Sequence, residues 1–322
     1  MDEIYKYNLS CDFSSKNSFQ YPYSNNNTNK PIYPIIKLGE RLTYNPDQYI
    51  DCSNVIVKAQ PLLSIDGRST TGLFKQIHDD GGIHNHLDYN GSVILSSIMP
   101  DRAIAGLSGE KYAELIDELG VDSYITPDGE TYLGEVNLSA CELSRIIYQT
   151  EIIQHLCPKQ IPIGLVKGCT VEQMQGHITY LQSCGVETYC FHAGDYFRGS
   201  EYISQIGLRH AFAIRTMVPK LMIYGVGSKK HINSFRFADG FATHSHYVRA
   251  FRGFKNNGVK WVKCENSTVT KEVIMNNLCL INQFINDLSW QQELLFPYYI
   301  EHYEAQGTNV TQIKQIINNS CT

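Results

Sequence analysis

Short apolar segments alternate with longer segments of helical pattern along most of this chain. Most of the apolar segments are continuous runs, the kind that is buried on both faces of a parallel sheet. The sequence predicts strands over 33–37, 54–58, 92–96, 121–125, 161–166, 186–191, 220–225 and 259–263. Roughly eight strands alternating with helices favour an α/β fold, a closed (β/α)8 TIM-like barrel. A doubly wound open sheet is the alternative.

The segments between these strands have the apolar spacing of helices, and several begin with residues that favour a helix start. The sequence predicts helices over 109–119, 137–156, 170–183, 200–216 and 270–286, with additional C-terminal helices over 288–305 and 309–319. Ser108 and Thr170 are suited to cap two of them. Residues 1–30 are rich in Asn, Ser and Tyr, so we expect a loose, disordered arm there. Residues 31–322 are then expected to form a single barrel domain.

Composition and charge limit which classes of protein this chain can belong to. The 322 residues are 43% hydrophobic, enough for a sizeable core, and carry a formal net charge of -5. This charge gives no general attraction for nucleic acid, so such binding would need a local basic patch. The longest apolar runs are too short to span a membrane and the N-terminus lacks a signal pattern, so we expect a cytoplasmic protein. The ten cysteines form no Cys-x-x-Cys pair and are expected to be reduced.

The most informative motif is Lys220 to Gly253. It comprises an apolar strand, a Gly225-Val-Gly227 turn, a short polar helix, a second strand-like piece that bears Asp239, and Arg249-Ala-Phe-Arg252. The order resembles that of the tRNA-guanine transglycosylase superfamily, including its DNA-modifying relatives, and the resemblance covers about residues 80 to 255. It implies a barrel whose site lies at the strand ends, with arginines on the nucleic-acid backbone.

The resemblance also implies a set of substrate contacts. Asp122, in Asp122-Ser-Tyr-Ile-Thr-Pro127, matches the aspartate that binds the base, and Asp128 is close enough to substitute. Lys167 replaces a glutamine that contacts the base carbonyl, and we expect Asp122 or Asp195 to pair with it.

Three further positions complete this expected substrate site. Gly194, together with Gly225 and Gly227, would offer backbone to a flat 7-deazaguanine base, and His192 is a new feature beside Gly194. Ser96 stands where the family has a carboxylate.

The expected catalytic groups depart from the family pattern. Asp239 matches the first of two family aspartates, and Ala242 stands where the second, the nucleophile, belongs. Asp239 is therefore either a displaced nucleophile or a cap of local structure. His244 and His246 would share one face of a strand and could act as acid or base. The arginines at 249 and 252 would contact phosphate or form an ordinary solvated helix face.

Three functions follow from these residues. The first is base exchange or glycosidic cleavage at a guanine or 7-deazaguanine in DNA or tRNA. The second is a non-catalytic subunit that pairs with an active homologue, because carboxylates are missing at Ser96 and Ala242. As protein partner we expect a second copy, in a homodimer, or an active homologue, in a heterodimer. The third is a barrel enzyme for a small molecule or peptide, built on Lys167 and the histidines. The family's C-terminal zinc site has no counterpart, and we expect neither metal nor cofactor.

Overall fold

The computed structural model describes residues 30–36, 38, 53–197, 199–258, 260–264 and 271–286. They fall within one compact unit, residues 29–288. The predicted arm over 1–30, apart from residue 30, and the predicted helices over 288–305 and 309–319 lie outside the described residues.

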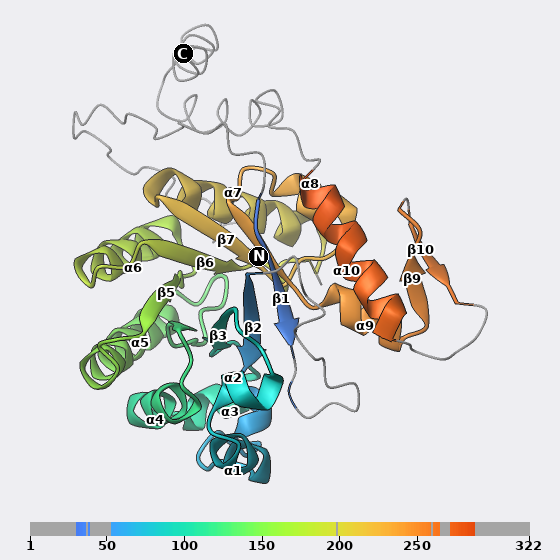
Figure 1. Ribbon diagram of the computed structural model, residues 1–322. Coiled ribbons are helices and arrows are strands. Elements are labelled where there is room, and N and C mark those ends of the chain that lie inside the picture. The colour runs from blue at the N-terminus through green and yellow to red at the C-terminus, as the bar shows by residue number, and fades with distance from the viewer. Residues whose placement is uncertain are drawn as a thin grey trace, which may run out of the picture. The chain divides into compact units, whose positions relative to one another are not determined.

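Eight parallel strands close into a barrel in which each strand pairs with its neighbours in the sequence (Figure 1). The strands are β1 (Ile32–Ile36), β2 (Asn54–Lys58), β3 (Ser92–Ser96), β4 (Ser123–Ile125), β5 (Ile161–Leu165), β6 (Thr188–His192), β7 (Lys220–Tyr224) and β8 (Gly240–Thr243). The ring closes where Ile32 of β1 pairs with Phe241 of β8. The prediction of a (β/α)8 barrel is confirmed.

The last barrel strand differs from the prediction. The segment expected as a strand over 259–263 contains β10 (Trp261–Lys263), which pairs antiparallel with β9 (Phe254–Asn256) outside the barrel. The eighth barrel strand is instead Gly240–Thr243, the strand-like piece that follows Asp239. Its four residues are all buried, so it lacks the alternation that marks a longer strand.

Helices surround the barrel. The described helices are α1 (Gly72–Asp79), α2 (Ile83–Leu87), α3 (Asp101–Gly106), α4 (Gly109–Leu119), α5 (Val136–Leu156), α6 (Val171–Ser183), α7 (Glu201–Met217), α8 (Lys229–Ser234), α9 (Ser245–Phe251) and α10 (Lys271–Asn286), with a short 3-10 turn, η3 (Gln60–Leu62). Ser108 and Thr170 cap α4 and α6, accepting from the N–H of Lys111 and Gln173. No described helix has the length and apolarity needed to cross a membrane.

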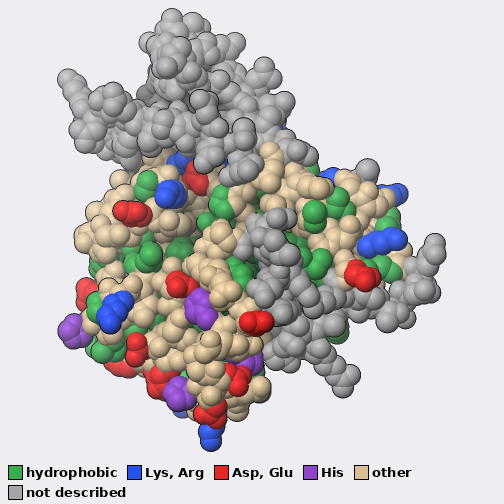
Figure 2. All heavy atoms as spheres, viewed as in Figure 1, with side chains coloured by type: hydrophobic (Ala, Val, Ile, Leu, Met, Phe, Trp, Pro, Cys, Tyr) green, Lys and Arg blue, Asp and Glu red, His purple; other side chains and the backbone are tan. Residues whose placement is uncertain are grey.

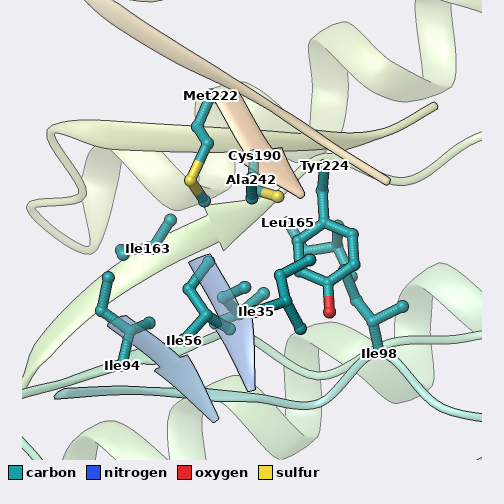
Figure 3. Packing of buried hydrophobic residues seen from close by; sticks show 11 residues of the cluster. Ile35, Ile56, Ile94, Ile98, Ile163, Leu165, Cys190, Met222, Tyr224 and Ala242 are labelled. Carbon is teal, nitrogen blue, oxygen red and sulfur yellow. The ribbon is translucent and has the colours of Figure 1, made fainter. Parts of the chain in front are cut away.

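The barrel interior is filled by side chains from all eight strands (Figure 3). The side chains that β1 to β5 contribute to the interior are mostly aliphatic. On the opposite side, β6 to β8 contribute Cys190, Met222, Tyr224 and Ala242. The interior is thus a packed core, and polar chemistry is confined to the two ends of the barrel.

Candidate functional site

Polar side chains gather at the carboxyl end of the barrel, where each follows a buried strand residue. Side chains two residues apart in a strand point to the same side, so a residue two positions after a core residue also points inward. The pairs of core residue and following polar residue are Ile56 and Lys58, Ile94 and Ser96, Leu165 and Lys167, Cys190 and His192, and Met222 and Tyr224. We call these five polar residues, together with Asp128, the strand-end cluster.

Asp128 and Lys167 form the central ion pair of this cluster. Lys167 Nζ lies 2.8 Å from Asp128 Oδ1, and their side chains are only 16% and 6% exposed. The carboxylate also accepts the N–H of Gly129 at 2.8 Å. The predicted partners of Lys167, Asp122 or Asp195, are therefore wrong, and Asp128 takes this place because it follows the carboxyl end of β4.

Helix α6 fixes the backbone of Lys167. His177 Nδ1 accepts the Lys167 N–H at 3.1 Å, so the imidazole is neutral and carries its proton on Nε2. Burial lowers the pKa of His177 to about 4, which keeps the ring in this acceptor form at neutral pH. Nearby, Gln173 accepts the N–H of Cys169 and donates to the carbonyl of Val136, which ties the β5–α6 loop to α5.

His192 stands beside the ion pair at the end of β6. Its Nδ1 lies 3.7 Å from Asp195 Oδ2, and its side chain is one-fifth exposed (20%). Burial lowers the pKa of His192; Asp128 and Asp195 oppose this effect, and Lys167 and Lys58 add to it. The ring is thus neutral at neutral pH, the form in which an imidazole can act as a proton acceptor.

Tyr224 and Ser96 complete the inner wall. The Tyr224 ring meets His192 edge to face, with centroids 5.5 Å apart, and the Ser96 hydroxyl donates to the Tyr224 hydroxyl at 3.3 Å. Burial raises the pKa of Tyr224 well above its ordinary value, so the phenol stays protonated. Ser96 therefore has a hydrogen-bonding role in the wall and offers no carboxylate.

The predicted glycine turns lie against His192. Gly225 adopts φ +90, and a Cβ built there would stand 3.2 Å from Gly194 Cα and 3.3 Å from His192 Cδ2. A Cβ at Gly227 would collide with Ser245 Oγ at 1.6 Å. Close approach of the Gly225 and Gly194 backbones thus requires glycine at 225, and the Ser245 side chain of α9 requires glycine at 227. The predicted contact of these glycines with a flat base stays a prediction.

Asp122 lies at the wrong end of the barrel for its predicted role. It directly precedes β4, where its Oδ2 accepts the N–H of Val93 at 2.7 Å and lies 3.2 Å from His84 Nε2. This is the amino end of the barrel, opposite the strand-end cluster. The motif Asp122-to-Pro127 spans the whole strand, so its first residue is at one end and its last at the other.

Asp239 is displaced from the cluster in the same way. It directly precedes β8, accepts the N–H of Leu221 at 2.7 Å and pairs with the buried Arg215 at 3.3 Å. The expectation that it acts as a nucleophile is therefore corrected, and its interpretation as a cap of local structure agrees with these contacts. Ala242 points into the closed core and is fully buried.

His244 and His246 do not lie on one face of a strand, although the sequence predicted this arrangement. His244 precedes α9, and His246 lies within α9 with no exposed surface, its ring 6.4 Å from that of His244. Burial lowers the pKa of His246 to about 3, so it is a neutral core residue. Arg249 lies over the Trp261 ring at 5.6 Å, and Arg252 is exposed.

Sequence patterns missed two members of the cluster, Lys58 and Tyr224, and did not commit to Asp128. The available signal was position: each follows or ends an apolar strand of a predicted barrel. No group of three or more His, Cys, Asp or Glu side chains within the described part of the chain could hold a metal ion. The cluster instead offers two cations, a carboxylate, a neutral imidazole and two hydroxyl groups.

No model of a known protein family matches this chain. No curated protein matches it either. The resemblance to the transglycosylase superfamily therefore stays a prediction carried by the motifs of the sequence.

Proposed function

We propose that the protein is a transglycosylase-like enzyme that acts on the glycosidic bond of a guanine or 7-deazaguanine base in DNA or RNA. The observation that carries this proposal is the Asp128–Lys167 pair at the carboxyl ends of β4 and β5. An ammonium group donates to a carbonyl, and a carboxylate accepts from N–H groups. A guanine-type base presents a carbonyl beside an N–H on one edge and so complements this pair.

The glycines support a flat ligand at the same end of the barrel. Gly194 and Gly225 carry no side chain next to His192, although a Cβ at Gly225 would already press on Gly194 at 3.2 Å. Backbone that lacks Cβ atoms allows a planar ring to approach closely. We therefore place the base between the Asp128–Lys167 pair and these two glycines.

His192 is the proposed proton acceptor of the reaction. Water or an incoming base attacks the anomeric carbon, and the bond from this carbon to the departing base breaks. The electron pair stays on the departing base, while the proton of the attacking group passes to His192 and then to that base. The scheme needs no covalent intermediate, which fits the place of Asp239 at the opposite end.

A local basic surface supports a nucleic-acid substrate. Residues 220–264 hold nine Lys and Arg but a single acidic residue, although Glu265 and Glu272 follow. Arg252, Lys255, Lys260 and Lys263 are all exposed on or beside the β9–β10 hairpin. Figure 2 shows blue side chains at the right, over this hairpin, and red ones gathered at the lower edge, over α1 to α4.

A base-exchange assay tests the catalytic proposal. Labelled guanine and 7-deazaguanine are offered with duplex DNA and with tRNA. We expect Asp128→Asn and His192→Gln to lower exchange at least about 100-fold, the usual contribution of a positioned acid or base. Asp239→Asn is the matched control and should keep exchange once folding is verified by circular dichroism. Exchange abolished in the folded control but normal in Asp128→Asn would refute the assignment.

The nucleic-acid surface has a separate test in the salt dependence of binding. Removing three lysines with Lys255→Gln, Lys260→Gln and Lys263→Gln should flatten the plot of log affinity against log salt by roughly two to three units for duplex DNA. The control makes the same change at the exposed Lys75, Arg102 and Lys159, which lie outside residues 220–264. Equal slopes in the two variants would remove the hairpin from the proposal.

A non-catalytic subunit is the second candidate. It is favoured by the absence of a carboxylate at two positions: Ser96 is bonded to Tyr224, and Ala242 is enclosed in the core. Calorimetry would then detect binding of the base, lost in Lys167→Met, while the purified chain exchanges no base. Exchange that appears only on addition of an active homologue would select this function.

A further inference from the structure

Helix α5 holds the backbone around Asp128. The Asp128 carbonyl accepts an N–H of Arg145 Nη2 at 2.9 Å, and the N–H of Glu130 donates to Glu142 Oε2 at 3.3 Å. Glu142 and Arg145 lie one helical turn apart on α5, with side chains 21% and 28% exposed. Strand β4 ends before this point, at Ile125, so contacts with α5 are what fix the backbone that carries the carboxylate.

The guanidinium group of Arg145 joins three partners at once. Its Nε and Nη2 donate to Glu142 Oε2 at 3.0 and 2.9 Å, Nη2 also donates to the Asp128 carbonyl, and Nη1 donates to Gln149 Oε1 at 2.8 Å. Gln149 in turn donates to the carbonyl of Leu107, which follows α3. A lysine has no planar fork and cannot make this set of bonds. We call Glu142, Arg145 and Gln149 the α5 clamp.

The loop that carries Asp128 lies directly against this clamp. A Cβ built at Gly129 would stand 2.7 Å from Ile146 Cδ1, 3.0 Å from Glu142 Oε2 and 3.1 Å from Arg145 Nη2. Glycine at 129 therefore allows the close approach of loop and helix. The N–H of Gly129 also donates to Asp128 Oδ1 at 2.8 Å, which ties the carboxylate to the same stretch of backbone.

The ion pair cannot fix the carboxylate by itself. Lys167 reaches Asp128 Oδ1 at 2.8 Å at the end of a flexible four-carbon stem. A base that accepts from the ammonium group and donates to the carboxylate needs both groups within about 0.5 Å of their places. The rigid contacts of the α5 clamp, on the other side of the loop, supply this precision.

We propose that Arg145 is a positioning residue: it holds the backbone of Asp128 so that the Asp128–Lys167 pair is preformed for a base. The ligand in this inference rests on the proposed function, but the placement of the ion pair can be measured without any ligand. Arg145 acts through Asp128, so its removal should have no effect once the carboxylate itself is gone.

Acetylation of Lys167 by acetic anhydride, mapped by mass spectrometry, reports on the ion pair in the free protein. We expect Arg145→Met to raise the rate at Lys167 roughly tenfold, because the amine loses its charged partner. Asp128→Asn should do the same, and the double variant should react no faster than Asp128→Asn alone. Lys111→Met is the matched control, since it removes a similar pair with Glu114 on α4 (2.7 Å, 22% and 40% exposed) and should leave Lys167 unchanged.

A conservative variant guards against loss of folding. Arg145→Lys keeps the positive charge beside Glu142 but lacks the fork, so we expect a rate at Lys167 between those of the wild type and Asp128→Asn. Circular dichroism verifies that each variant is folded. Unchanged labelling of Lys167 in both folded Arg145 variants, or rates that multiply in the double variant, would overturn the inference.

Equilibrium dialysis with labelled guanine measures the consequence for the ligand. Arg145→Met should weaken guanine binding about 10- to 100-fold and leave the affinity for duplex DNA unchanged. Guanidinium ion, kept well below unfolding concentrations, should restore part of the binding to Arg145→Ala, since a small pocket lined by Asp128 and Gln149 adjoins the clamp. Potassium chloride at equal ionic strength should not.

The two measurements separate the inference from the proposed function. A wild-type protein that binds no guanine would refute the proposed function, whereas the acetylation rates would still decide whether Arg145 places the ion pair. Guanine binding that is equally strong in the wild type and in folded Arg145→Met would overturn the inference and leave the proposed function in place.

Discussion

At the scale of single residues, Asp122 and Asp239 occupy equivalent positions at the amino end of the barrel. Each directly precedes a strand and binds the second residue of the preceding strand twice, through its own N–H and through its carboxylate. Asp122 binds Val93 and Asp239 binds Leu221 in this way. The carboxylate thus extends the ladder of hydrogen bonds by one acceptor, which gives both residues a structural role.

The two aspartates should differ in their contribution to stability. Asp239→Ala leaves the Leu221 N–H without an acceptor and the buried Arg215 without its carboxylate, so we expect a loss of about 2–4 kcal/mol. Asp122→Ala should cost less, about 1–2 kcal/mol, because its other partner, His84, is one-third exposed (34%). Urea denaturation followed by circular dichroism measures both, with the exposed Asp117→Ala as control. Equal losses in all three variants would contradict this account.

Gly225 has a backbone conformation that a side chain would strain. Its φ of +90 is unfavourable for residues with a Cβ, and an added Cβ would press on Gly194 at 3.2 Å. Gly225→Ala should therefore lower the free energy of unfolding by about 1–2 kcal/mol. Gly72→Ala is the control, because a Cβ at this helical position meets nothing within 4 Å. A Gly225→Ala protein as stable as the Gly72→Ala protein would show that the turn can relax.

At the scale of elements, one buried asparagine joins the segments that follow the barrel. Asn277 of α10 accepts the N–H of Asn256 at 2.6 Å and donates to the carbonyls of His246 and Phe254. It thereby links α9, β9 and α10, which lie side by side in Figure 1. The β9–β10 hairpin has only two strands, and such a hairpin needs packing of this kind to be stable.

Asn277→Ala should release this hairpin while the barrel stays folded. We expect amide exchange of residues 254–263 to accelerate roughly tenfold or more, since the loss of buried hydrogen bonds costs at least about 1–3 kcal/mol. Gln283→Ala, on the exposed side of the same helix, is the control. Hydrogen exchange with mass spectrometry resolves the two regions. Uniform acceleration in barrel and hairpin would mean that Asn277 stabilises the whole fold instead.

At the scale of the whole molecule, buried neutral histidines make stability depend on pH. Burial lowers the pKa of His177 and of His210 to about 4 and that of His246 to about 3, from an ordinary 6.5. Below pH 6.5 the unfolded chain takes up protons that the folded protein does not. Stability is therefore full above pH 6.5 and falls as the pH approaches 4.

The expected loss between pH 7 and pH 4 is several kcal/mol in total, since each pKa unit corresponds to about 1.4 kcal/mol. Urea midpoints measured across this range should decline as the pH falls. His210→Gln should flatten the decline, whereas the exposed His155→Gln should leave it unchanged. Stability that is constant from pH 7 to pH 4 would contradict the burial of neutral imidazoles.

The sequence by itself determined the barrel. Seven of the eight barrel strands lie close to their predicted positions, because short, continuous apolar runs separated by helical patterns have few other ways to be buried. It also indicated Lys167, His192, Gly194 and Gly225 as strand-end residues, since each directly ends or follows such a run.

Only the tertiary structure decided which polar residues meet. The two ends of a barrel strand are only a few residues apart in the sequence. An error of a few residues in the predicted start of a strand therefore assigns a residue to the wrong end of the barrel. This is why Asp122 and Asp239 cap the amino end, while Asp128, from the same motif as Asp122, pairs with Lys167. The buried state of His246 and the place of β8 likewise depend on contacts between distant segments, which local sequence patterns do not encode.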